Sequence, residues 1–230
     1  RFVLEQYGFE PKTLDNKTVR AGGLNAAFDV IVLPDVSKEV IATGRPKRDE
    51  GAMRYFPELP TEYAGGLDKE GAAALKAFVE GGGTLVALSS ATEYVIDELA
   101  LPVRNGLARA EGFAIAGSIL RAEVAGGHPV TDGLPSEVAV FQDEALAFET
   151  TLPGPDMERR VLATYPSDHQ DVLLSGWMRG EEAITRKAAA VALTYGKGRI
   201  VLLGFRAQHR AQTPGTFPFL WNALYWSTAE

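Results

Sequence analysis

Hydrophobic and polar positions along the 230 residues switch between the periods typical of strands and of helices, which predicts an α/β domain. Residues 28–35 (FDVIVLPD) form a short apolar run rich in β-branched side chains. Such a run predicts a strand that is buried on both faces and lies in the middle of a sheet. Residues 84–88 (TLVAL) predict a second buried strand, and residues 1–8 predict an amphipathic helix closed by Gly8.

The segment around the second strand predicts two helices and a very tight turn. A helix with apolar positions at helical spacing begins at Asp68, which is suited to an N-cap, and ends at the glycines 81–83. After the strand, Ser90 and Glu93 have the spacing of a capping box, so a second helix is expected at once. The chain therefore passes from strand to helix through a sharp turn at Ser89 and Ser90.

Residues 36–67 carry three prolines and no sustained period, which predicts a long loop with at most one short helix. Residues 101–187 change to short alternating runs separated by Gly, Pro and Asp, which predicts a mostly β segment. A hairpin of two buried strands and a final helix then follow. We expect one domain over 1–230, a doubly wound, mostly parallel, flavodoxin-like sheet, with a β-rich insertion over 101–186.

Composition narrows the function classes. The net charge of -7 and the absence of any Lys/Arg run argue against a nucleic-acid partner. The chain contains no cysteine, which excludes disulfides, thiolate metal sites and a cysteine nucleophile. No apolar run approaches the roughly 18 to 20 residues that cross a bilayer, so we expect no membrane partner.

The order of elements resembles the class I glutamine amidotransferase-like superfamily: strand, long loop, Gly-Gly, helix, Gly-rich turn, strand, Ser-Ser, helix. In that superfamily the residue between the second of these strands and its helix is a nucleophilic cysteine at a sharp elbow, and this sequence has Ser89 there. The resemblance also places Gly65 and Gly66 where the superfamily has an oxyanion-hole glycine. Because the cysteine is missing, we expect a domain without catalytic activity.

Three sequence segments have a more specific resemblance to one kind of domain: residues 63–88, 173–177 (LLSGW) and 195–226. Together they look like the amidotransferase-like domain that follows a zinc carboxypeptidase domain in some large bacterial peptidases. Trehalose-utilisation-type proteins share the same broad fold and are the nearest competing relatives. The resemblance implies a preceding peptidase domain as a partner, and it suggests export without fixing the compartment.

The zinc-binding His-x-x-Glu pair of that peptidase family is absent from the sequence. The three histidines are each followed three residues later by a residue other than glutamate, as the pairs His128 and Thr131, His169 and Val172, and His209 and Gln212 show. No zinc ligand is therefore carried over, and the resemblance places any zinc in the parent protein, outside this chain. Asp168, His169 and Asp171 lack a distant fourth ligand and make a weak metal site.

Ser89 is the one candidate nucleophile at the elbow. Its hydroxyl would need a histidine as a base, and His209, after the final strand, is the best placed. The superfamily's catalytic histidine precedes a glutamate, whereas Arg210 follows here. The simpler alternative is that Ser89 and Ser90 cap a helix.

A polar cluster after the last strand is the second candidate site, because ligands of open α/β sheets bind at the carboxyl ends of strands. With two residues of the long loop it could line a pocket for a small polar molecule or a peptide carboxylate. The alternative is a salt-bridged rim. The candidate residues are Glu62, Tyr63, Gly65, Gly66, Arg206, Gln208, Arg210 and Gln212.

The remaining histidines and tryptophans favour structural roles. His128 and His169 lie in turn-rich segments and are expected at the surface. Trp177, Trp221 and Trp226 are expected to pack in the core or an interface, with Trp177 near the pocket.

The leading hypothesis is a catalytically silent amidotransferase-like accessory domain of a larger hydrolase. It would bind a ligand, pack against a peptidase domain or assemble subunits. The alternatives are a small-molecule hydrolase that uses Ser89 and a sugar-related binding module of the trehalose-utilisation type. Since the sequence opens at Arg1 with a helix instead of a strand, we expect a strand or a domain to precede it in the parent.

Overall fold

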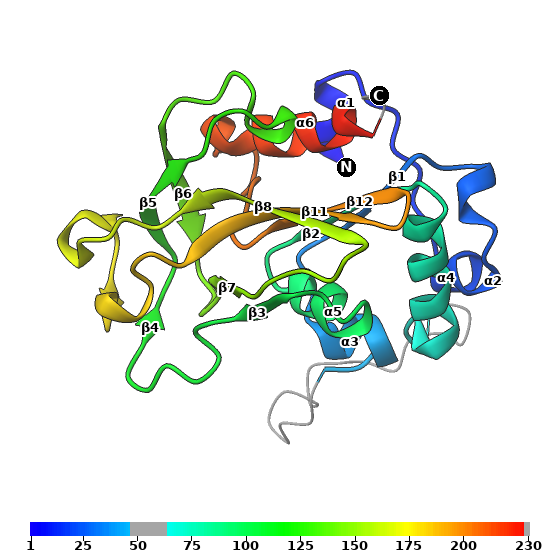
Figure 1. Ribbon diagram of the computed structural model, residues 1–230, viewed down its shortest axis with the longest axis horizontal. Coiled ribbons are helices and arrows are strands. Elements are labelled where there is room, and N and C mark those ends of the chain that lie inside the picture. The colour runs from blue at the N-terminus through cyan, green and yellow to red at the C-terminus, as the bar shows by residue number, and fades with distance from the viewer. Residues whose placement is uncertain (47–63, 228–230) are drawn as a thin grey trace.

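The computed structural model describes residues 1–46 and 64–227, and it forms an α/β fold (Figure 1). The helices are α1 (Phe2–Gln6), α2 (Asn16–Ala21), α3 (Lys38–Thr43), α4 (Asp68–Glu80), α5 (Ala91–Glu98) and α6 (Phe217–Trp226). The strands are β1 (Val30–Leu33), β2 (Thr84–Leu88), β3 (Val103–Asn105), β4 (Ala114–Ile115), β5 (Ser118–Val124), β6 (Glu137–Gln142), β7 (Phe148–Thr150), β8 (Met157–Thr164), β9 (Leu173–Ser175), β10 (Met178–Arg179), β11 (Ala188–Tyr195) and β12 (Gly198–Leu203). The helices at 1–8 and 68–80, the strand at 84–88 and the final hairpin are confirmed.

One mixed sheet runs through the molecule in the order β1-β2-β12-β11-β8-β5-β6. β1, β2 and β12 are parallel, whereas every pair beyond β12 in this order is antiparallel. The parallel part is therefore smaller than the sequence predicted. The difference arises because residues 101–186, predicted as a β-rich insertion, supply β5, β6 and β8 to the same sheet.

The first strand lies at the end of the sheet order, where the sequence predicted a place in the middle. Its apolar run is explained by the layers on its two faces. Val30 and Val32 pack against one buried cluster, while Ile31 and Leu33 pack with the other. Helices on both faces therefore give an edge strand the continuous apolar pattern of a central one.

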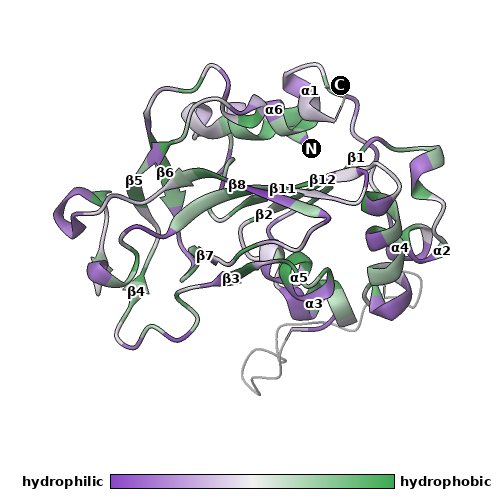
Figure 2. Ribbon diagram, in the orientation of Figure 1, coloured by the Kyte–Doolittle hydropathy of each residue, from purple (hydrophilic) through white to green (hydrophobic). Residues whose placement is uncertain are grey.

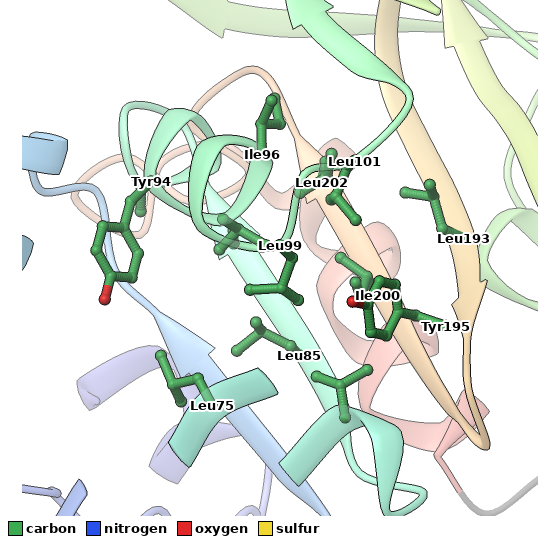
Figure 3. Close-up of a cluster of buried hydrophobic side chains, with 14 of the residues drawn as sticks. Leu75, Leu85, Tyr94, Ile96, Leu99, Leu101, Leu193, Tyr195, Ile200 and Leu202 are labelled. Atoms are coloured by element: carbon green, nitrogen blue, oxygen red, sulfur yellow. The ribbon is translucent and has the colours of Figure 1, made fainter. Parts of the chain in front are cut away.

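Helices cover both faces of the sheet in Figure 1, with α1 and α6 on one side and α2, α3, α4 and α5 on the other. Figure 2 shows mainly hydrophobic middle strands, whereas α2, α3 and α4 carry strongly hydrophilic stretches. Figure 3 shows how Leu75 of α4 and Leu99 after α5 lie over Leu85 and Ile200 of the sheet. No helix within residues 1–46 and 64–227 is long and apolar enough to cross a membrane.

Two predicted caps do not form. The N-cap of α4 is Leu67 without a side-chain bond, and Asp68 instead pairs with Arg20 at 3.1 Å. Ser90 already has helical angles (φ -56°, ψ -28°), so its side chain does not reach the N-cap geometry. The Glu93 carboxylate accepts a hydrogen bond from Asn105 instead, at 3.1 Å. Asn105 in β3 thus ties α5 to the β-rich segment.

Candidate functional site

The carboxyl ends of the three parallel strands meet at one edge, which we call the carboxyl edge. Asp35 follows β1, Ser89 follows β2 and Arg206 follows β12. Parallel strands bring such residues together because their carboxyl ends point the same way. The turn after β2 and the segment after β12 therefore lie at the same edge of the sheet.

Ser89 forms the sharp elbow that the sequence predicted. Its φ of +47° is in the left-handed region, which is uncommon for a residue other than glycine. The Ser89 N–H donates to the Leu203 carbonyl at 2.8 Å, and the Thr92 hydroxyl donates to the Ser89 carbonyl at 2.7 Å. The elbow was expected to expose the side chain, but Ser89 is 0 % exposed. Its hydroxyl has no hydrogen-bond partner among the described residues.

The first N–H after the elbow is already occupied. The backbone N–H of Ser90 donates to Asp35 Oδ1 at 3.1 Å. In a nucleophile elbow this N–H belongs to the oxyanion hole and must be free to meet a developing negative charge. A carboxylate of the protein itself holds it here, so the donor is not open to a substrate oxyanion.

Arg206 lies between two carboxylates, in the salt-bridged arrangement that was the alternative to a ligand pocket. Its Nε is 2.9 Å from Asp35 Oδ2, and its Nη2 is 2.9 Å from Asp143 Oδ2. The backbone N–H of Arg206 also donates to the Phe141 carbonyl at 3.1 Å, which fixes the start of this segment against β6. The guanidinium therefore links the end of β1 to the loop that follows β6.

His209 is engaged away from Ser89. Its ring stacks on Phe141 with centroids 4.2 Å apart, and its Nδ1 is 3.5 Å from Arg206 Nη1. A Ser89–His209 hydrogen bond is absent, since the serine hydroxyl has no partner in the described part of the chain. Among the polar residues after β12, Gln208, Arg210 and Gln212 are exposed, and Arg206 alone joins the buried network.

The loop after β6 supplies carboxylates that the sequence did not single out. Gln142 Nε2 donates to the Leu146 carbonyl at 2.6 Å, which holds the loop closed. Within it, Asp143 pairs with Arg206. Glu144 is exposed by surface area, but partial desolvation raises its pKa and the charge of Asp143 raises it further. Asp35 had a readable signal, since it ends the first predicted strand. Asp143 and Glu144 had none, because their segment was assigned to an insertion.

Gly65 and Gly66 are packed between α2 and α3. Gly65 has a φ of +91°, and its carbonyl accepts from Asn16 Nδ2 at 2.8 Å. The Gly66 carbonyl accepts from Arg20, and a Cβ on Gly66 would lie 2.3 Å from the backbone of Ala42. This close approach is a structural reason for glycine at 66, and the oxyanion role stays a prediction. Glu62 and Tyr63 lie outside the described residues.

The remaining candidates are distributed over other parts of the surface. His128 is half-buried instead of exposed: its Nδ1 accepts the Val130 N–H at 3.1 Å, and its ring meets the Trp226 ring edge-on at 4.7 Å. Burial, followed by the charge of Arg160, lowers the pKa of His128. His169 is exposed, as expected. No group of three metal-ligating side chains occurs within residues 1–46 and 64–227.

A hollow of about 700 Å³ lies beside His128 and not at the elbow. It is lined by the loop at 126–134 and by Asn222, Tyr225 and Trp226 of α6. A second hollow, of about 570 Å³, lies near the turn between β11 and β12. Neither touches Ser89 or Arg206.

No family model matches the sequence, and a comparison with curated proteins finds none that is significantly similar. Solved structures do share the fold. A Thermoplasma acidophilum protein assigned to GMP synthase has a TM-score of 0.55 at 14% identity, over 99% of this chain and 85% of that chain. A cytoplasmic protein from Salmonella typhimurium has a TM-score of 0.55 at 14% identity, over 97% and 83%. A ThuA-like protein from Bacteroides uniformis has a TM-score of 0.51 at 15% identity, over 100% and 81%. The chain thus has a glutamine amidotransferase-like fold.

Proposed function

We propose that this chain is a non-catalytic amidotransferase-like domain that serves a larger hydrolase as an accessory or ligand-binding part. The observation that carries the proposal is the state of the elbow. Ser89 replaces the nucleophilic cysteine, its hydroxyl is enclosed, and Asp35 occupies the N–H that an oxyanion would need. A nucleophile elbow needs a reactive side chain, access for the substrate and a free N–H for the oxyanion, and all three differ here.

The chemistry of serine supports this proposal. A serine hydroxyl is hardly ionised near neutral pH, so it attacks only when a base within hydrogen-bond reach takes its proton. His209 is the candidate base, but its ring stacks on Phe141 and its Nδ1 lies 3.5 Å from Arg206 Nη1. Activation of Ser89 would therefore need both residues to rearrange.

The larger enzyme that we propose is a zinc carboxypeptidase whose metal site lies outside this chain. Its support is the resemblance of the phrases at 63–88, 173–177 and 195–226 to a domain that follows such a peptidase. The domain would pack against the preceding peptidase domain or assemble identical subunits. Phe2 and Tyr7 at α1 and Tyr225 of α6 are exposed aromatic side chains. The rings of Tyr7 and Trp221 are in contact, with centroids 4.9 Å apart.

Two other functions remain as alternatives, a small-molecule hydrolase and a sugar-binding module, and each predicts a different result. A small-molecule hydrolase would need Ser89, and the sharp φ of +47° is the feature that favours it. A trehalose-utilisation-type binding module would need affinity for a sugar, and a glycan array without a hit would count against it. The ThuA-like neighbours share the fold with this chain.

The experiment that tests the proposal compares the wild type with Ser89→Ala in ester and glutamine hydrolysis, using p-nitrophenyl butyrate and L-glutamine. We expect neither protein to exceed the rate without protein, and the same is expected of the control Ser167→Ala, which replaces an exposed serine away from the elbow. A rate in the wild type that Ser89→Ala abolishes and Ser167→Ala keeps would establish the hydrolase instead. In an intact peptidase parent, Ser89→Ala should leave peptide hydrolysis unchanged.

A further inference from the structure

Contacts with α6 hold the loop at 126–134 in place. Asn222 Nδ2 donates to the Val130 carbonyl at 3.2 Å and to the Asp132 carbonyl at 2.9 Å. Val130 is 0 % exposed and belongs to the same buried cluster as Trp226. The loop thus lies on α6 through a side-chain amide and a buried apolar residue, and it forms one wall of the hollow of about 700 Å³.

Glycines near both ends of this loop allow it to move as a unit. Gly127 has a φ of +78° and Gly133 a φ of +71°, and a Cβ at either position would meet nothing within 4 Å. Glycine adopts such angles without strain and reaches other conformations easily. Between them, the Thr131 N–H donates to the His128 carbonyl at 2.9 Å. The segment is therefore a compact turn between two permissive positions.

His128 connects this turn to the helix. Its Nδ1 accepts the Val130 N–H at 3.1 Å and so caps the short 3₁₀ turn Pro129–Thr131. Its ring meets the Trp226 ring edge-on, with centroids 4.7 Å apart. A ring nitrogen accepts a hydrogen bond only while it carries no proton, so the neutral ring has its proton on Nε2. The closed loop therefore requires an unprotonated Nδ1.

The surroundings of His128 oppose a positive charge on its ring. Burial, followed by the charge of Arg160 of β8, lowers the pKa of His128 below the ordinary 6.5. Arg199 of β12 already lies over the indole ring that His128 meets, 5.4 Å from its centroid, so a second cation there would be repelled. Asp132 and Tyr225 are the other titratable groups that line the hollow. No carboxylate forms an ion pair with His128 within residues 1–46 and 64–227.

We propose that His128 is a pH-sensitive switch: protonation of its ring releases the loop at 126–134 from α6 and opens the hollow between them. An imidazolium cannot accept the Val130 N–H, so the turn loses its cap. A charged ring held against Trp226 also loses hydration without gaining an anion. Both effects favour the released loop, in which the ring meets water. The switch is independent of the elbow and of the function proposed above.

The pH window follows from the direction of the pKa. In the released loop His128 takes up its proton near the ordinary 6.5, whereas the closed loop takes it up only at a lower pH. The closed form is therefore fully favoured above 6.5. As the pH falls below this value, the closed form loses up to about tenfold in population ratio per pH unit, until it is protonated as well.

Hydrogen exchange followed by mass spectrometry, corrected for the intrinsic rate at each pH, measures the protection of the peptide that contains 126–134. Samples from pH 8 to pH 5.5 stay above the sequence pI of about 5.1. The wild type should lose up to about tenfold in protection between pH 6.5 and pH 5.5. Far-UV circular dichroism should stay unchanged over this range, because the release is local.

Two histidine variants identify the group that titrates. His128→Asn places a side-chain oxygen that does not titrate where it can accept the Val130 N–H, since asparagine is a good N-cap residue. This variant should keep its protection at pH 5.5. His169→Asn removes an exposed histidine and should lose protection as the wild type does.

Arg160→Gln leaves His128 in place, so a folding defect of His128→Asn does not decide the result. Without this cation the closed form takes up its proton at a higher pH, so the variant should retain about twofold more protection than the wild type at pH 5.5. The proposal is overturned if the protection of the wild type does not change with pH, if His128→Asn loses it as the wild type does, or if Arg160→Gln retains no more. It is also overturned if the circular dichroism signal falls together with the protection.

Discussion

Asp35 Oδ1 accepts the backbone N–H of Ser90 at 3.1 Å, so a carboxylate fills the place where an elbow enzyme would stabilise an oxyanion. The other oxygen, Oδ2, pairs with Arg206 at 2.9 Å. One side chain thereby closes the elbow after β2 and ties it to the segment after β12. The chain has a glutamine amidotransferase-like fold, and the N–H that follows the elbow is bonded to a side chain of the protein itself.

Asp35→Ala should destabilise the protein by about 2 to 3 kcal/mol, because it leaves the Ser90 N–H without an acceptor and Arg206 with one carboxylate fewer. Urea unfolding followed by circular dichroism measures the difference. Asp156→Ala, at an exposed position, is the matched control and should cost less than about 0.5 kcal/mol. Equal losses in the two variants would show that Asp35 does not hold the elbow.

Ser89→Ala should keep the stability of the protein or raise it by up to about 1 kcal/mol, because the variant removes a buried hydroxyl that has no partner among the described residues. Ser89→Gly should also relieve the positive φ of 47°. Chemical denaturation of the three proteins gives the order. A loss of more than about 1 kcal/mol in Ser89→Ala would mean that the hydroxyl makes a bond the structure does not show.

Gly66→Ala should destabilise the protein by about 1 to 3 kcal/mol, because a Cβ there would lie 2.3 Å from the Ala42 backbone and must push α3 away. Gly126→Ala is the control, since a Cβ at Gly126 meets nothing within 4 Å. Thermal unfolding of both variants separates the close approach from a general effect of replacing glycine. If Gly66→Ala is as stable as Gly126→Ala, the packing of Gly66 against α3 is not required.

Glu144 should make stability depend on pH. Burial, aided by the charge of Asp143, raises its pKa above the ordinary 4.5, so the folded state holds the proton more tightly than the unfolded state. As the pH rises through 4.5 and then through the higher folded value, the unfolded state loses its proton first and stability falls. Below 4.5 the group contributes no such loss.

Glu144→Gln removes this titration, so the variant should gain stability over the wild type as the pH rises through that window and keep the gain at neutral pH. Urea midpoints measured from pH 4 to pH 8 for both proteins give the comparison. A difference that is flat with pH would show that Glu144 titrates normally in the folded protein.

The sequence predicted the elements of the amidotransferase-like core because their patterns are local. The glycines after α4, the run at 84–88 and the turn of the last hairpin each act within a few residues. The sharp turn at Ser89 was predicted for the same reason, and its φ of +47° agrees. Long-range pairing is not visible in such patterns, and this is why β1 was placed in the middle of the sheet.

The sequence identified candidate residues of the site, but it did not predict which side chains contact one another. The rule that ligands bind at the carboxyl ends of strands made Arg206 a candidate. One of its partners is Asp143, which is 63 positions earlier in the chain and reaches the edge only because β6 lies beside the segment after β12. Spacing alone does not reveal such a contact. His209 was the best-placed candidate base for Ser89, whereas its ring stacks on Phe141, a contact that depends on the same long-range pairing.

The most direct test of the central claim is covalent labelling with a fluorophosphonate, which reacts with serines that a base has activated. The wild type, Ser89→Ala and Ser167→Ala are incubated with the probe in the folded state, and the modified residue is located by mass spectrometry. A non-catalytic domain with an enclosed Ser89 predicts no labelling at this position. Stoichiometric labelling of Ser89, kept in Ser167→Ala and lost in Ser89→Ala, would contradict it and would identify a serine hydrolase.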